Sequence, residues 1–127
     1  MKNREHYQGF KDLKVYQLAF KMALAIFEES KSFPKEEKYS LTDQIRRSSR
    51  SVATNIAEAW EKRRYPKSFV SKLIDAASEK AETIVWLDFS NCHNYINAVK
   101  HKYYVDNYLE VGRMLNSMIN SPEKFCR

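Results

Sequence analysis

Apolar residues recur every three or four positions along four long segments of the chain, and proline-containing breaks separate the first three segments. This spacing places the apolar side chains on one face of an α-helix. We therefore expect helices over about residues 12–32, 40–62, 66–91 and 97–120. Because the links between them are short, consecutive helices should run antiparallel. The pattern predicts one all-α domain over residues 1–127, an up-down-up-down four-helix bundle.

Composition excludes several other classes of protein. With 2 Gly and 3 Pro in 127 residues, the chain lacks the turn-forming residues of a β-sandwich or barrel. No apolar run approaches the roughly 20 residues of a membrane span, and the first residues lead into no apolar stretch typical of a signal peptide. The 2 cysteines make no disulfide framework. We therefore expect a cytoplasmic protein without a membrane segment.

The expected helix starts have recognisable signals. Asp12 and Asn97 are suited to capping the first turns of the first and fourth helices. Ser40, with Asp43 three residues later, forms a weak capping box at the second helix. Pro66 is suited to the first turn of the third helix, where its missing amide hydrogen has no cost. The inward face of that helix is expected to carry Phe69, Leu73, Ala76, Ala77, Ala81, Ile84 and Leu87.

The first expected helix has more apolar circumference than the core of one small bundle can cover. One stripe, made of Val15, Ala19, Met22 and Ile26, should face the core. A second stripe lies beside it, and a contiguous exposed patch of this kind rarely stays open in a monomer. The pattern predicts that copies of the chain associate through the bulky residues of this second stripe, which are Tyr16, Phe20 and Phe27.

The chain is basic, with 22 Lys and Arg against 16 Asp and Glu and a formal charge of +6. A basic domain attracts polyanions, most commonly nucleic acid. Arg50 and Arg63 would lie about 20 Å apart on a helix, enough to contact several phosphates. The alternatives are ion pairs within or between subunits, for example with Glu58, Glu61, Glu79 or Glu82, and plain solvation. The candidate nucleic-acid-binding residues are Arg46, Arg47, Arg50, Lys62, Arg63, Arg64 and Lys67.

The sequence indicates no catalytic or metal site. Asn55 and Glu58 are better explained by hydrogen bonds between helices or subunits than by acid–base catalysis, because no nucleophile or phosphate-binding loop accompanies them. The possible metal ligands have no paired spacing. These residues are His6, His93, His101, Cys92 and Cys126. We expect a protein that is not an enzyme and needs no cofactor or metal.

Several segments together resemble the four helix bundle protein family, also called the 23S ribosomal RNA intervening-sequence protein family. They are residues 10–17, 32–37, 39–48, 51–59 (SVATNIAEA), 78–87 and 112–116. The family usually has glycine at the position of Ala59, which leaves the expected fold unchanged. The resemblance implies a four-helix protomer in a ring-like homopentamer. Some family members are encoded inside intervening sequences of ribosomal RNA genes.

A similar protein, the accessory factor of diversity-generating retroelements, is a basic barrel that binds nucleic acid and a reverse transcriptase. Nothing in this sequence distinguishes that branch, so its activity is not transferred. We expect a non-enzymatic, homo-oligomeric bundle with a basic surface that binds RNA or DNA. The alternative is a protein-interaction adaptor or scaffold that binds an acidic partner and has no direct nucleic-acid role.

Overall fold

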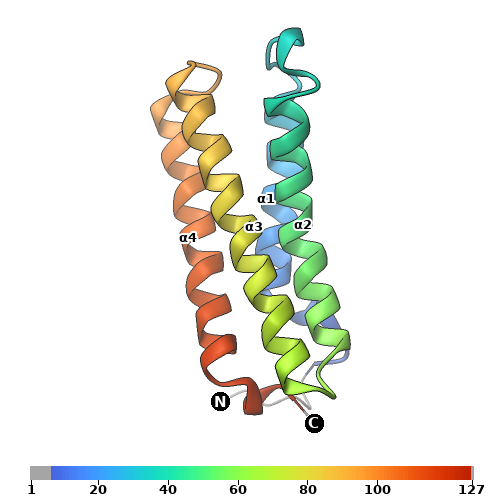
Figure 1. Ribbon diagram of the computed structural model, residues 1–127. Helices are drawn as coiled ribbons and strands as arrows, with labels where there is room; N and C mark the ends of the chain where they lie inside the picture. Colours follow the sequence, from blue (N-terminus) through green and yellow to red (C-terminus); the bar gives the residue numbers. More distant parts are fainter. Residues whose placement is uncertain (1–6, 127) are drawn as a thin grey trace.

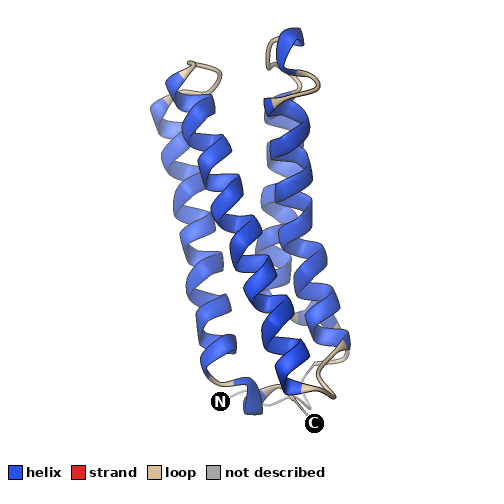
Figure 2. Ribbon diagram, in the orientation of Figure 1, coloured by secondary structure: helices blue, strands red, loops and turns tan. Residues whose placement is uncertain are grey.

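The computed structural model describes residues 7–126, and all regular structure in that range is helical (Figures 1 and 2). Adjacent helices run in opposite directions (Figure 1). The α1–α2 and α3–α4 links lie at one end of the bundle, and the α2–α3 link lies at the other. The prediction of four helices is confirmed, and their bounds are α1 (Lys14–Ser30), α2 (Leu41–Glu61), α3 (Pro66–Cys92) and α4 (Ala98–Asn120).

In the part of the chain that the structure describes, three short 3₁₀ turns flank these helices. They are η2 (Phe10–Asp12) before α1, η3 (Lys35–Glu37) in the α1–α2 link and η4 (Pro122–Lys124) after α4. No helix in residues 7–126 has an apolar stretch long enough to cross a lipid bilayer.

The sequence located two of the helix starts correctly. The Asn97 side chain accepts a hydrogen bond from the backbone amide of Lys100 at 2.8 Å, and this bond caps the first turn of α4. Pro66 occupies the first position of α3, as predicted.

The caps predicted for α1 and α2 are wrong. Asp12 lies inside η2, and its carboxylate accepts a hydrogen bond from the amide of Gln8 at 2.7 Å rather than from α1. Ser40 precedes α2 but makes no capping bond, because its hydroxyl donates to the Glu37 carboxylate at 2.7 Å. The same Glu37 carboxylate accepts the amide of Leu41 at 3.4 Å, so Glu37 takes the role expected of Ser40.

The core contains the first α1 stripe as predicted, and Val15, Ala19, Met22 and Ile26 are all buried. The register predicted for α3 is wrong at one position. Ala81 was expected to face inward and is exposed. Thr83 is buried instead, and its hydroxyl is hydrogen-bonded within the protein: it donates to the carbonyl oxygen of Glu79 and shares a hydrogen bond with the Ser48 hydroxyl, each at 2.8 Å. The largest buried side chains beyond α1 include Tyr108, Phe69, Leu73, Leu87 and Leu115.

Candidate interaction surfaces

An apolar groove of about 560 Å³ runs between α1 and α2. The ring centroids of Tyr16 and Phe20 lie 5.8 Å apart in a stacked arrangement. Phe20 is 47% exposed and Leu24 is 57% exposed. The second α1 stripe is thus gathered in one groove, and α2 contributes small side chains to its wall. The lining residues are Phe10, Tyr16, Phe20, Ala23, Leu24, Phe27, Arg50, Ala53, Thr54 and Ala57.

Two of the predicted nucleic-acid-binding arginines lie beside this groove. The guanidinium carbon of Arg46 is 4.4 Å from the centre of the Phe27 ring, and that of Arg50 is 5.4 Å from it. Both distances are within range of a cation–π interaction. The Arg46 Nε also donates to the Ser30 hydroxyl at 2.7 Å, so this arginine is fixed between α1 and α2.

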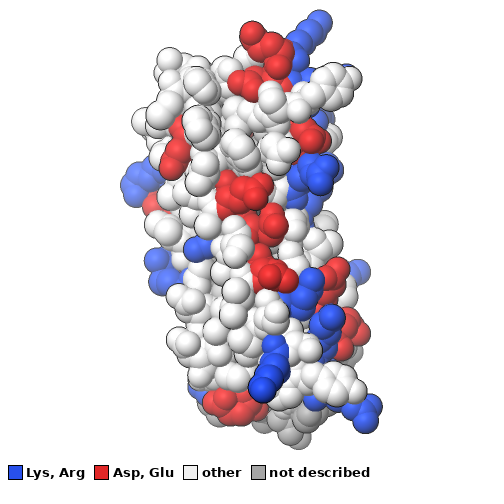
Figure 3. Space-filling view, viewed as in Figure 1, with Lys and Arg blue, Asp and Glu red and all other residues white. Residues whose placement is uncertain are grey.

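The remaining basic residues fall into two further groups. Arg47 is exposed on α2, whereas Lys62, Arg64 and Lys67 are exposed around the α2–α3 link. None of these four cations forms an ion pair with a carboxylate in residues 7–126. Figure 3 shows positive and negative side chains interleaved along the α2 edge. The seven predicted residues therefore do not make one continuous patch.

Arg63 differs from its neighbours in the link because it is half-buried. Its guanidinium carbon lies 3.6 Å from the centre of the Trp60 ring, and its Nε donates to the Trp60 carbonyl oxygen at 2.8 Å. This arginine holds the end of α2 and is a poorer candidate for phosphate binding than Arg64.

Asn55 and Glu58, which the sequence suggested for subunit contacts, lie apart from the groove. The Asn55 amide donates to the Ser51 carbonyl oxygen at 2.9 Å on the same helix. Glu58 forms a 2.7 Å ion pair with Lys72 of α3, and this hydrogen bond raises the pKa of Lys72. The polar pair is thus used within the protomer, while Tyr16, Phe20 and Phe27 stay together.

The acidic residues of α3 do not pair with the arginines of α2. Glu79 is half-buried and forms no ion pair within the described chain. Burial, together with repulsion from Glu82 and Asp75, raises the pKa of Glu79. Glu82 accepts a hydrogen bond from the Trp86 indole at 3.2 Å. Figure 3 shows acidic side chains gathered over the middle of α3.

Sequence reasoning missed an exposed apolar ridge on the outer face of α3. Ile74 is 49% exposed, and Val85 and Phe89 are each 47% exposed. Ser78 and Ala81 lie between them on the same face and are also exposed. The spacing 74, 78, 81, 85, 89 is a helical stripe that could have been read from the sequence.

A network of carboxylates and tyrosines joins the two helical hairpins at the end with the α1–α2 and α3–α4 links. The Tyr95 hydroxyl donates to Glu37 at 2.8 Å, which raises the pKa of Tyr95. Hydrogen bonds from Ser40 and Tyr95 in turn lower the pKa of Glu37. The Tyr104 hydroxyl donates to Glu29 at 3.0 Å, and burial is the main reason why the pKa of Tyr104 is raised. These polar groups therefore have hydrogen-bond partners within the protomer, and their bonds hold the two hairpins together at this end.

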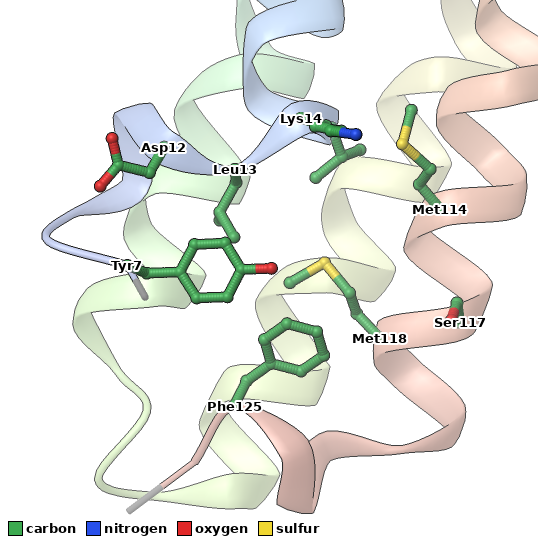
Figure 4. A pocket seen from close by; sticks show the side chains of 9 residues that line it. Tyr7, Asp12, Leu13, Lys14, Met114, Ser117, Met118 and Phe125 are labelled. Atoms are coloured by element: carbon green, nitrogen blue, oxygen red, sulfur yellow. The ribbon is translucent and has the colours of Figure 1, made fainter. Parts of the chain in front are cut away.

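A second cavity, of about 310 Å³, lies near the chain termini. Figure 4 shows the rings of Tyr7 and Phe125 next to Met118 in this cavity, with the Asp12 carboxylate turned away from them. No group of three His, Cys, Asp or Glu side chains in residues 7–126 is placed to hold a metal ion. His6 lies outside the described residues.

Two comparisons place the chain among known proteins. A family model described as 23S rRNA-intervening sequence protein matches residues 11–117. The chain belongs to this family. The fold is also similar to the crystal structure of a protein of unknown function from the S23 ribosomal protein family of Bacteroides thetaiotaomicron, with a TM-score of 0.75 and 29% sequence identity. That similarity covers 84% of this chain and 95% of the other. No curated protein matches the chain.

The family seen in the sequence resemblance is therefore confirmed. Neither comparison shows a link to the retroelement accessory factor or a pentameric ring.

Proposed function

We propose that this family member is a non-enzymatic, homo-oligomeric four-helix bundle that binds RNA or DNA through its outward-facing cations. The observation that carries the proposal is the exposure of Arg47, Lys62, Arg64 and Lys67 without a carboxylate partner in residues 7–126. On a chain of net charge +6, these cations are free to bind phosphate. The family name, which refers to a ribosomal RNA sequence, supports RNA as one such partner.

The geometry of the cations suits an extended polyanion. Lys62, Arg64 and Lys67 surround the α2–α3 link, and Arg47 lies about 22 Å along α2 from Lys62. Phosphates of one strand follow one another at about 3.4 Å, so this distance spans several of them. Tyr65, which is 63% exposed beside the link cations, offers a ring on which an unpaired base can stack.

Self-association would strengthen this binding. The groove leaves the large apolar side chains of Phe20 and Leu24 half-exposed, and a second copy can cover them. Each added subunit repeats the cation set, which raises the avidity for a long nucleic acid without new contacts. The family resemblance suggests that five subunits assemble.

The test compares the salt dependence of binding to a single-stranded RNA and a duplex DNA. In the Arg64→Ala/Lys67→Ala variant we expect the slope of log K against log salt to fall by about 1.5 units, because two phosphate contacts are lost. Adding Arg47→Ala should lower the slope by up to about one unit more. An unchanged slope would assign these cations to another partner.

The matched control is Lys102→Ala/Arg113→Ala on α4. This variant loses the same charge, but its two cations are already paired with Asp106 and Glu110. We expect its slope to stay close to that of the original protein. Equal losses in both variants would mean that net charge alone drives binding.

The alternative is an adaptor that binds an acidic protein. The interleaving of positive and negative side chains along α2 favours this reading, because nucleic acid would meet carboxylates there (Figure 3). The ratio of absorbance at 260 and 280 nm, measured on protein purified before and after nuclease treatment, separates the two. Nucleic acid carried through purification supports the first proposal, and its absence together with a flat salt response supports the adaptor.

A further inference from the structure

We propose that the α1–α2 groove of one protomer receives the outer ridge of α3 from a second protomer, so that copies join head to tail. This inference rests on the self-association proposed above and names the two surfaces that carry it. The groove is defined by Tyr16, Phe20, Leu24 and Phe27, with Arg50 at its edge. The ridge is defined by Ile74, Ser78, Ala81, Val85 and Phe89.

The two surfaces are comparable in length and share an apolar character. The ridge extends about 22 Å along α3 from Ile74 to Phe89, and the groove extends about 16 Å along α1 from Tyr16 to Phe27. Ser78 and Ala81 keep the middle of the ridge slim, which allows it to approach the groove closely. Both surfaces expose large apolar side chains by about half within the protomer. Burying each against the other removes both patches from water.

Charge decides which surfaces pair. Arg50 borders the groove and forms no ion pair with a carboxylate in residues 7–126. Glu82 lies beside the ridge, three residues before Val85, and Glu79 lies about one turn before Glu82. Neither carboxylate forms an ion pair with a cation in residues 7–126. A groove facing a ridge therefore brings opposite charges together.

The symmetric alternatives bring like charges together. Two grooves in contact would oppose arginines, and two ridges would oppose glutamates, which is unfavourable in an interface. The raised pKa of Glu79, caused by burial and by its acidic neighbours, is in keeping with a surface that gains from an added cation. Two different surfaces on each copy make a heterologous contact, which closes into a ring when the rotation permits.

This assignment also divides the basic residues by role. Arg46 and Arg50, which cover Phe27, belong to the subunit contact. Arg47 and the cations of the α2–α3 link stay on the outside and remain available for phosphate.

The decisive experiment mixes two variants that each lack one surface. Phe20→Glu blocks the groove and Val85→Glu blocks the ridge, and both positions are half-exposed, so the fold should tolerate them. Size-exclusion chromatography with light scattering should give a larger assembly for the original protein and a protomer of 15.1 kDa for each variant alone. The equimolar mixture should give a species of about 30 kDa, twice the 15.1 kDa protomer, because only one intact groove and one intact ridge can meet.

The control is Leu109→Glu on α4, which is 44% exposed outside both surfaces and should leave the assembly unchanged. An assembly that survives Val85→Glu, or a mixture that stays at the mass of the protomer, would overturn the head-to-tail contact. A monomeric original protein would instead overturn the self-association on which the inference rests.

A charge exchange tests the same contact with smaller changes of shape. Arg50→Glu and Glu82→Arg should each weaken association by roughly tenfold or more, and the double variant should recover most of that loss. Circular dichroism of each variant checks that helix content is preserved. Additive weakening in the double variant would show that the two residues do not meet.

Discussion

Two tyrosines one turn apart on α4 should respond in opposite ways to the same substitution. Tyr108 is fully buried, and its hydroxyl has no hydrogen-bond partner in residues 7–126. The nearby Tyr104 is also buried, but its hydroxyl donates to the Glu29 carboxylate at 3.0 Å. We expect Tyr108→Phe to raise the free energy of unfolding and Tyr104→Phe to lower it.

The magnitudes follow from the hydrogen bonding of each hydroxyl. A buried polar group without a partner costs about 1–3 kcal/mol, and the small void left by removing one oxygen offsets part of the gain. Tyr108→Phe should therefore add about 1 kcal/mol. Tyr104→Phe loses a hydrogen bond to a charged acceptor and should cost about 1–2 kcal/mol. For a chain of this length, 1 kcal/mol shifts Tm by roughly 3–5 °C.

Urea denaturation followed by circular dichroism measures both changes. The protomer concentration is kept fixed, because self-association would add to the apparent stability. The control is Tyr103→Phe, since Tyr103 is 46% exposed and its substitution should change the free energy by less than about 0.5 kcal/mol. If Tyr108→Phe destabilises the protein as much as Tyr104→Phe does, the buried hydroxyl has a partner, such as an internal water, and the reasoning fails.

Three further substitutions test other contacts by the same denaturation assay. Gly112→Ala should stabilise α4 by up to about 1 kcal/mol, because alanine favours a helix more than glycine does. The added Cβ would meet only the flexible end of Lys80, whose Nζ would lie 2.9 Å from it. A loss of stability would show that the Lys80 side chain cannot move aside. Thr83→Val should cost about 1 kcal/mol, since it removes a buried hydroxyl that joins α3 to α2 at 2.8 Å, and no change would mean that this bond is dispensable. The pKa of Glu37 is lowered from its ordinary value of 4.5. Ionised Glu37 therefore stabilises the folded protein fully above about pH 4.5, and this stabilisation is lost as the pH falls through the lowered pKa. Glu37→Gln should therefore lower the urea midpoint near pH 7 and weaken its fall toward pH 3, whereas an unchanged pH profile would contradict the role of the Tyr95–Glu37 bond.

The sequence predicted the helices well because their existence depends on periodicity, which is local. The core stripe that begins at Val15 and the cap at Asn97 could both be read from residue spacing. The caps at Asp12 and Ser40 could not, because 3₁₀ turns before α1 and α2 redirect these side chains. Such turns are only three residues long and leave no periodic signal.

The interaction surfaces were predictable only in part. Tyr16, Phe20 and Phe27 follow helical spacing and do lie in one groove. Whether Arg46 faces solvent or covers Phe27 depends on how α1 packs against α2, which no local pattern specifies. The ridge on α3 was missed because Ala81 was assigned to the core. With Ala81 on the inner face, the exposed apolar residues of α3 no longer form one helical stripe.

The buried hydroxyls of α2 and α3 have a consequence for how these helices tolerate mutation. Ser49 of α2 and Ser90 of α3 each donate to a carbonyl oxygen of their own helix. Their polarity is therefore satisfied before the helices meet, and alanine should replace them at little cost. A larger side chain would force the two backbones apart. At these positions, natural variation should be limited by side-chain volume and should admit glycine-sized to serine-sized residues of either polarity.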